Sequence, residues 1–226
     1  MTAVVPPSRP VTALISVQRI TRVEDGERLN ALLWRAGSGW RMVSSAVLGG
    51  GIAERAWVLN AQVSHGYRRT DPARHLAELA RTVGAQGPGV GLMTAADVTR
   101  YTGAHDMGAE AVATAGLGVR GWAAAPDGAL PRPTAPGTIN ILAALPVALS
   151  DAALVNAVST ATEAKVQALL DAGYDCSGTP TDAVCVAART PRPGEEVHAF
   201  GGPRSLWGAR LARAVHAAVR AAAEEA

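Results

Sequence analysis

Hydrophobic and polar residues alternate along the first part of the chain, a pattern that is typical of β-strands with one buried face. The pattern predicts four strands, at residues 12–17, 28–34, 41–48 and 56–63. Glycine clusters at 37–39 and 49–51 lie between the later runs, and such clusters form tight turns between neighbouring strands. We therefore expect an antiparallel meander in this region.

The spacing of apolar residues then becomes helical. Asp71 is a good N-cap, Pro72 suits the first helical position, and Gly84 ends the apolar repeat. These signals predict a helix between Asp71 and Gly84. Short apolar runs at 90–95 and 109–117 predict two buried strands.

The second half of the chain has clearer boundaries. Its predicted elements are a loop with four prolines at 121–136, a strand at 137–145, a helix from Ser150 or Asp151 to about Ala172, a strand at 182–188 and an alanine-rich helix at 205–223. Strands and helices are thus mixed, without the regular alternation of a doubly wound sheet.

These elements predict an α+β fold in which a mixed or antiparallel sheet packs against helices. A chain of 226 residues can bury one core of this kind. We therefore expect a single layered domain over residues 11–226. Residues 1–10 contain three prolines and predict a disordered lead-in.

Composition excludes several classes of function. Charged residues make up 18% of the chain and the formal net charge is only +2, without the basic clusters of nucleic-acid binding proteins. No apolar run approaches the length of about 18 residues that a membrane span needs, and the N-terminus lacks a signal-peptide pattern. We expect a cytoplasmic protein that acts on a small molecule, with no nucleic-acid or membrane partner.

The cysteines and histidines do not form a recognisable metal motif. Cys176 and Cys185 are too few for a disulfide framework. None of the five histidines lies in a His-Glu-x-x-His or paired Cys/His motif, so we expect no metal. His65 is the histidine most worth testing, either as a general acid or substrate contact or as an ordinary surface residue.

Polar side chains form a stripe on the predicted long helix. Asn156, Thr160 and Glu163 recur at helical spacing, whereas Val155 and Leu169 lie at other angles and can face a core. Such a stripe usually meets water. This one contains no lysine or arginine, which leaves a functional interpretation open.

The turn from Ser177 to Asp182 combines three hydroxyl groups, a glycine and a carboxylate. Such a turn can offer hydrogen-bond donors to a developing oxyanion, or a hydroxyl nucleophile. The same residues are also typical of a turn in which an aspartate binds nearby backbone groups. The spacing alone does not decide between these two interpretations.

Four strings in this half resemble the adenosylcobinamide amidohydrolase (CbiZ) family in order and spacing. They are Pro136-Gly-Thr-Ile-Asn-Ile, Ser150-Asp-Ala-Ala-Leu-Val-Asn-Ala, Thr162-Glu-Ala-Lys and Gly178-Thr-Pro-Thr-Asp-Ala-Val. The likeness continues more loosely into the first half and covers roughly residues 40–222.

The resemblance implies an enzyme that hydrolyses the amide between a ring carboxyl of adenosylcobinamide, or of a related corrinoid, and its aminopropanol arm. Adenosylcobyric acid is the implied product, and the step serves cobamide salvage. The corrinoid is then the substrate, so no cofactor is expected.

Roles in this reaction can be assigned to the residues described above. We predict Glu163 as the general base, Thr179 or Thr181 as nucleophile or hydrogen-bond donor, and Asp182 as the residue that orients a threonine. The predicted substrate-binding residues are Asn60, His65, Asn140, Asn156, Thr160 and Ser177. Asn140 and Asn156 are also candidate oxyanion donors.

Two other functions stay open at this stage. One is a corrinoid-binding protein without catalytic activity. The other is an aminopeptidase or amidase of the DmpA kind, a class of layered αββα hydrolases that the segment 137–178 also resembles. That likeness suggests an αββα arrangement here. A homodimer is compatible with the sequence.

Overall fold

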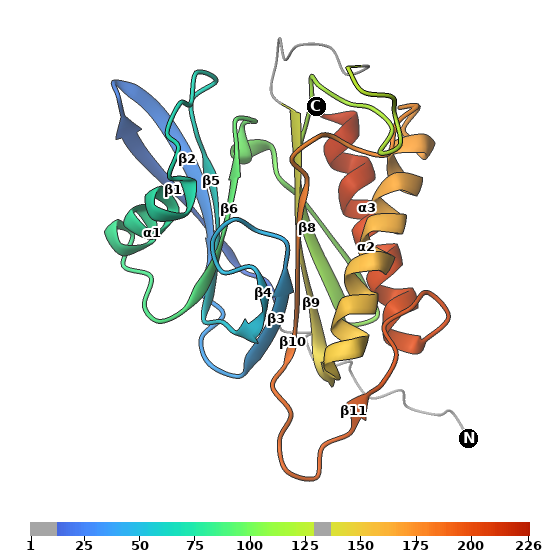
Figure 1. Cartoon of the computed structure of the whole chain (residues 1–226). Helices are drawn as coiled ribbons and strands as arrows, with labels where there is room; N and C mark the ends of the chain where they lie inside the picture. Colours follow the sequence, from blue (N-terminus) through green and yellow to red (C-terminus); the bar gives the residue numbers. More distant parts are fainter. Residues whose placement is uncertain (1–12, 129–136) are drawn as a thin grey trace, which may run out of the picture.

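Two β-sheets lie face to face, and helices cover their outer faces (Figure 1). The computed structural model describes residues 13–128 and 137–226, so the predicted lead-in at 1–10 and part of the predicted loop lie outside it. Helix α1 (Pro72–Thr82) covers one sheet, and helices α2 (Asp151–Asp171) and α3 (Leu206–Glu224) cover the other. The layers follow the order αββα, and the predicted layered α+β fold is confirmed.

The first sheet has the strand order β1-β2-β5-β6. Its strands are β1 (Val17–Glu24), β2 (Glu27–Trp34), β5 (Trp57–Gln62) and β6 (Gly89–Thr94). Strands β1, β2 and β5 are antiparallel neighbours, while β5 and β6 are parallel and are connected through α1. The chain therefore leaves β5 and β6 at the same end of the sheet.

The second sheet has the strand order β4-β3-β10-β9-β8-β7. Its strands are β3 (Trp40–Ser44), β4 (Gly51–Glu54), β7 (Thr102–Asp106), β8 (Ala109–Leu117), β9 (Gly137–Leu149) and β10 (Ala183–Arg189), and the short β11 (Val197–His198) pairs with β9. Strands β9 and β10 are parallel and are connected by α2, so both begin at one end of the sheet. Ser44 pairs with Cys185, so the antiparallel β3 finishes at that end too.

The predicted antiparallel meander is wrong, because β3 and β4 belong to the second sheet and β5 pairs with β2. Strand β3 is buried on both faces: Met42 packs between the sheets and Val43 packs toward the helices. Alternation of polar and apolar residues shows which faces are buried, but it does not identify the neighbouring strand. The strand predicted at residues 12–17 is also misplaced, because β1 begins at Val17.

The helices begin at the predicted caps. Ser150 caps α2 and Ser205 caps α3, each accepting a hydrogen bond of 3.1 Å from a backbone N–H three residues further on. Asp71 holds the N-cap position of α1, yet its carboxylate binds Arg69 rather than a backbone N–H. Within the described part of the chain, no helix has both the length and the apolar character of a membrane span.

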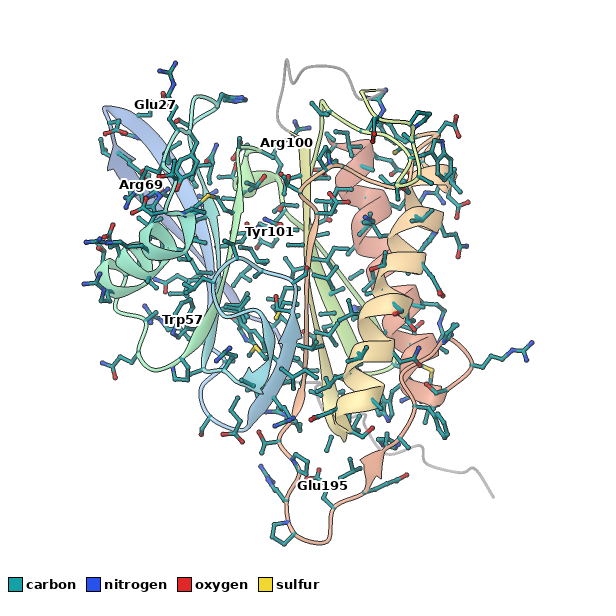
Figure 2. All side chains as sticks on the ribbon, in the orientation of Figure 1. Glu27, Trp57, Arg69, Arg100, Tyr101 and Glu195 are labelled. Carbon is teal, nitrogen blue, oxygen red and sulfur yellow. The ribbon has the colours of Figure 1, made fainter. Side chains whose placement is uncertain are left out.

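Helices α2 and α3 pack on the second sheet mainly through alanines, which let backbones approach closely. The buried alanines of α2 are Ala153, Ala157, Ala161, Ala164 and Ala168. Leu169 is buried as predicted, but Val155 is 56% exposed, because the alanine face rather than the valine face meets the sheet. Side chains also fill the space between the sheets, whereas Trp57 packs on the α1 side (Figure 2).

Candidate functional site

Strand ends and turns converge around a cavity of about 430 Å³ between the two sheets, which we call the intersheet cleft. Residues that line it include Ser45, Val47, Val63, Thr94, Thr138, Thr181 and Asp182. The parallel pairs β5–β6 and β9–β10 bring these positions together, because parallel strands end on the same side. Two predicted site residues, Thr181 and Asp182, therefore lie in the wall of one cavity.

The carboxylate of Asp182 is held from several directions. Its Oδ1 accepts the hydroxyl of Thr179 at 2.5 Å and the backbone N–H of Ile139 at 2.8 Å. Its Oδ2 accepts the backbone N–H of Thr179 at 3.1 Å and the ammonium of Lys165 at 2.5 Å. The side chains of Lys165 and Asp182 are only 8% and 11% exposed, so water screens this ion pair weakly. Bonds of this kind hold both partners in one orientation.

Gly178 allows this ion pair to form beside the turn. Its φ is +148°, and a Cβ at this position would lie 2.2 Å from Oδ2 of Asp182 and 2.5 Å from Nζ of Lys165. Glycine is therefore the residue that fits. The neighbouring Ser177, predicted to bind substrate, instead accepts a hydrogen bond from Ala123 N at 2.7 Å. Ser177 thus fastens an adjacent loop to the turn.

Hydroxyl groups line the cleft around Asp182. The Oγ1 atoms of Thr181 and Thr138 lie 2.5 Å apart, and Thr181 also donates to the carbonyl oxygen of Gly137 at 3.0 Å. Ser45 lines the same cleft, and its hydroxyl accepts a hydrogen bond from Val184 N at 3.1 Å. These side chains can bind a polar group of a substrate.

Asn60 and Asn140 lie together between the sheets, next to the cleft rather than in its wall. Asn140 Nδ2 donates to Asn60 Oδ1 at 2.8 Å, and Asn60 Nδ2 donates to Thr114 Oγ1 at 3.0 Å. Asn140 Oδ1 is buried without a hydrogen-bond partner among the described residues, beside a cavity of about 20 Å³. A cavity of that size holds about one water molecule. The pair therefore connects the two sheets behind the cleft.

The other predicted residues of α2 lie on the outer side of the second sheet. Glu163 and Thr160 line a separate groove of about 260 Å³ between α2 and α3. Thr160 is buried and donates to a backbone carbonyl at 2.9 Å, while Asn156 is exposed. Successive helical residues are rotated by about 100°, so Glu163 points away from the side on which Lys165 binds Asp182. The structure does not bring Glu163, Thr160 or Asn156 together with the threonines of the turn.

His65 lies in the exposed loop after β5, two residues beyond Val63, which lines the cleft. In residues 13–128 and 137–226, the His, Cys, Asp and Glu side chains form no group of three or more that can hold a metal ion. Burial raises the pKa of Cys176 and raises the pKa of Cys185 to about 12. Both thiols are also fully buried, so neither is placed to reach a substrate.

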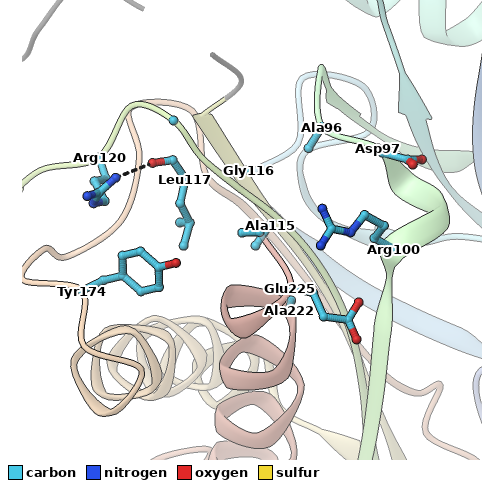
Figure 3. Close-up of a pocket in the computed structure, with 12 residues that line it drawn as sticks. Ala96, Asp97, Arg100, Ala115, Gly116, Leu117, Arg120, Tyr174, Ala222 and Glu225 are labelled. Atoms are coloured by element: carbon cyan, nitrogen blue, oxygen red, sulfur yellow. Dashed lines mark hydrogen bonds between the residues drawn. The ribbon is translucent and has the colours of Figure 1, made fainter. Parts of the chain in front are cut away.

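A second cavity, of about 410 Å³, lies at the edge of β8, and we call it the edge pocket (Figure 3). The turn 94–97 separates the two cavities: its first two residues line the cleft and its last two line the edge pocket. Arg100 enters from the short helix η1 (Val98–Arg100), and Arg120 and Tyr174 lie opposite (Figure 3). Arg120 donates to Leu117 O at 2.9 Å and lies over the Tyr174 ring.

The sequence predictions omit Lys165, although one signal points to it. It is the only lysine in a chain with 21 lysine and arginine residues. Arginine and lysine are not interchangeable where a compact ammonium group is needed, and here Nζ lies only 2.5 Å from the place that a Cβ on Gly178 would take. The predictions also omit Ser45 and Thr138, which reach the cleft only through the pairing of β3 and β9 with β10.

Comparison with known proteins matches residues 14–226 to the adenosylcobinamide amidohydrolase family. The chain is 32% identical over 187 residues to the adenosylcobinamide amidohydrolase of Methanosarcina mazei, which covers 80% of this chain and 88% of that relative. It is 46% identical over 87 residues to the adenosylcobinamide amidohydrolase of Halobacterium salinarum, which covers 38% of this chain and 36% of that relative. The family match includes every residue that lines the intersheet cleft.

Proposed function

This chain belongs to the adenosylcobinamide amidohydrolase family, and from that premise we propose that it hydrolyses the amide between the corrin ring and the aminopropanol arm of adenosylcobinamide. Water adds its hydroxyl group to the acyl carbon and a proton to the leaving nitrogen, which yields adenosylcobyric acid and aminopropanol. The corrinoid is the small-molecule partner in this proposal, and the setting is corrinoid salvage in the cytoplasm. The reaction as proposed uses no metal or cofactor.

The observation that carries the proposal is that the family match spans the whole intersheet cleft, both its hydroxyl groups and its ion pair. Amide hydrolysis requires a nucleophile, a proton carrier and hydrogen-bond donors for the oxyanion. The cleft and the turn beside it supply all three kinds of group from Thr179, Asp182 and Thr181.

Thr179 is the nucleophile in this proposal. Its hydroxyl already donates to Asp182 Oδ1 at 2.5 Å, which orients the oxygen lone pairs away from the carboxylate. As Thr179 Oγ1 bonds to the acyl carbon, its proton passes to Asp182 and then to the leaving amine. Water then cleaves the resulting ester and restores the threonine hydroxyl. Asp182 thus takes the general-base role that the sequence pattern assigns to Glu163.

Lys165 acts as a positioning residue behind Asp182. Its ammonium binds Oδ2, while the threonine hydroxyl binds Oδ1, so the two ligands hold the carboxylate from opposite oxygens. Thr181 and Thr138 lie on the cleft wall beside it, and a hydroxyl that rotates away from the Gly137 carbonyl can donate to the substrate carbonyl oxygen.

The direct test is to incubate the purified protein with adenosylcobinamide, with and without EDTA, and to identify products by liquid chromatography and mass spectrometry. We expect adenosylcobyric acid in both samples. The Thr179→Val variant should lose kcat by at least about a thousandfold, because it lacks the nucleophilic oxygen. The matched control is Thr162→Val, at an exposed position of α2.

Each alternative has its own outcome in this experiment. Corrinoid binding without any product identifies a binding protein and refutes the hydrolase proposal. Product only in the sample without EDTA refutes the metal-independent mechanism. Full activity of Thr179→Val refutes the assignment of Thr179 as the nucleophile and leaves an activated water as the attacking group.

A further inference from the structure

The edge pocket and the intersheet cleft are neighbours in the sheet as well as along the chain. Gly116, which lines the edge pocket, is the direct cross-strand partner of Thr138, which lines the cleft. Paired strands lie about 4.8 Å apart. A rigid macrocycle with side chains around its rim can therefore place one side chain in the cleft and another in the edge pocket.

The edge pocket presents hydrogen-bonding groups that the fold leaves unused. The side chain of Arg100 makes no ion pair or hydrogen bond with any residue that the structure describes, although it points into the pocket (Figure 3). Asp97 accepts two hydrogen bonds from Thr99, both on Oδ1, which leaves Oδ2 available. Glu225 adds a second carboxylate to the lining.

Strand β8 contributes an open edge to the same pocket. The ladder between β7 and β8 ends at the pair Thr102–Ala113, so in the described chain residues 114–117 of β8 have a partner strand only on the β9 side. Such an edge leaves backbone groups without a strand partner that can pair with another amide, although the Leu117 carbonyl already accepts a hydrogen bond from Arg120. Residues 115–117 line the edge pocket.

We propose that the edge pocket binds the primary carboxamide side chains on the rim of the corrin ring, while the amide to be cleaved lies in the intersheet cleft; this inference rests on the proposed function. A primary carboxamide is neutral and has both a carbonyl acceptor and two N–H donors. The pocket offers the matching groups, a free guanidinium as donor and carboxylates and a strand edge as acceptors.

The charges of the pocket favour a neutral ligand over an anionic one. Asp97 and Glu225 line it together with Arg100 and Arg120, so the arginines do not outnumber the carboxylates. A phosphate or carboxylate group of a ligand would meet two carboxylates of the protein at short range. Carboxamides avoid that repulsion and can still bind the Arg100 guanidinium and Oδ2 of Asp97.

The test compares Arg100→Ala with Arg74→Ala, an exposed arginine on α1 outside both cavities. We expect Arg100→Ala to raise KM for adenosylcobinamide about tenfold, because one charge-assisted hydrogen bond is lost, with kcat within about twofold of wild type. Arg100→Gln, which keeps a neutral donor, should give an intermediate KM. Arg74→Ala should match wild type in both constants.

An unchanged KM in Arg100→Ala, or a loss confined to kcat, overturns the inference while wild-type turnover upholds the proposed function. If the wild-type protein shows no turnover, the proposed function fails instead. Equilibrium dialysis with cobinamide then tests the edge pocket independently of turnover. A Kd raised about tenfold in Arg100→Ala supports the inference. An unchanged Kd, or no binding to the wild type, overturns it.

Discussion

Two of the four charged residues of helix α2, Glu163 and Lys165, are two positions apart and face different surroundings. Glu163 is exposed in the groove between α2 and α3. Lys165 is nearly buried and its ammonium binds Asp182 on the side of the intersheet cleft. One helix thus borders both the candidate catalytic group and a solvent-exposed groove.

The two surroundings differ in what a charge contributes. Arg213 lines the same groove as Glu163 and makes a largely exposed ion pair with Asp106, and exposed pairs contribute at most about 1 kcal/mol. The Lys165–Asp182 pair is shielded from water, so removing one partner leaves an uncompensated charge. Burial and pairing, rather than the polarity of a helix face, therefore distinguish the side of α2 that meets the candidate site.

The largest expected effect is that of Lys165→Met. The variant leaves Asp182 without its ammonium partner, which should lower the free energy of unfolding by about 3 kcal/mol and abolish measurable turnover. Urea unfolding followed by circular dichroism measures the first, and the product assay measures the second. The double variant Lys165→Met/Asp182→Asn should regain part of the stability but none of the activity, since the buried charge is gone and the proton acceptor is missing. Wild-type turnover in Lys165→Met would remove the ion pair from the mechanism.

Gly178→Ala disturbs the Lys165–Asp182 ion pair without removing either charge. Its Cβ would lie 2.2 Å from the Asp182 carboxylate, so we expect a loss of about 2 kcal/mol in stability and a loss of turnover. Gly173→Ala is the matched control, because Gly173 also has a positive φ, of +85°, but no atom lies within 4 Å of a Cβ built there. That control should lose about 1 kcal/mol and keep its activity. Equal turnover in the two variants would contradict the proposed geometry.

The helices and most strands of this protein can be predicted from local signals. Ser150 and Ser205 begin their helices as capping residues, and the strand beginning at Gly137 follows from its apolar run. The partners of β3 cannot be predicted in this way, because both faces of that strand are buried and tertiary packing decides which strand lies beside it. The predicted meander is wrong at that point because no local signal specifies the order of the strands.

The candidate site shows the same division. The turn at 177–182 is predictable because its hydroxyls and carboxylate are adjacent in sequence. Lys165 reaches that turn from a helix, and Ser45 reaches the cleft from a strand far away in sequence. The angle of Glu163 on the helix is also predictable, but which angle faces the sheet depends on the alanine contacts.

A smaller effect is expected from Trp122→Ala. All five tryptophans lie in the described residues: Trp34, Trp40 and Trp57 are buried, Trp207 is partly buried, and Trp122 is 44% exposed. The adjacent Ala123 is bonded to Ser177, so the loop that carries Trp122 is attached to the candidate catalytic turn. If the exposed indole contacts the corrinoid of the proposed reaction, we expect a KM about fivefold higher with little change in kcat. Trp207→Phe is the comparison on the α3 side and should leave KM unchanged; an equal change in both variants would contradict a specific role for Trp122.

The smallest expected effect is that of Glu163→Gln, and it is the sharpest test of the difference between the two sides of α2. The substitution keeps the size and the helix propensity of the side chain and removes only its charge. Because Glu163 is exposed in the outer groove, we expect stability within about 0.5 kcal/mol of wild type and unchanged kcat and KM. The measurement is the full steady-state analysis with adenosylcobinamide beside Asp182→Asn, which should be inactive. A large loss of kcat in Glu163→Gln, with binding intact, would return the general-base role to this residue. It would also require the substrate to bind between α2 and α3, because no single substrate carbonyl can contact groups on both sides of the second sheet.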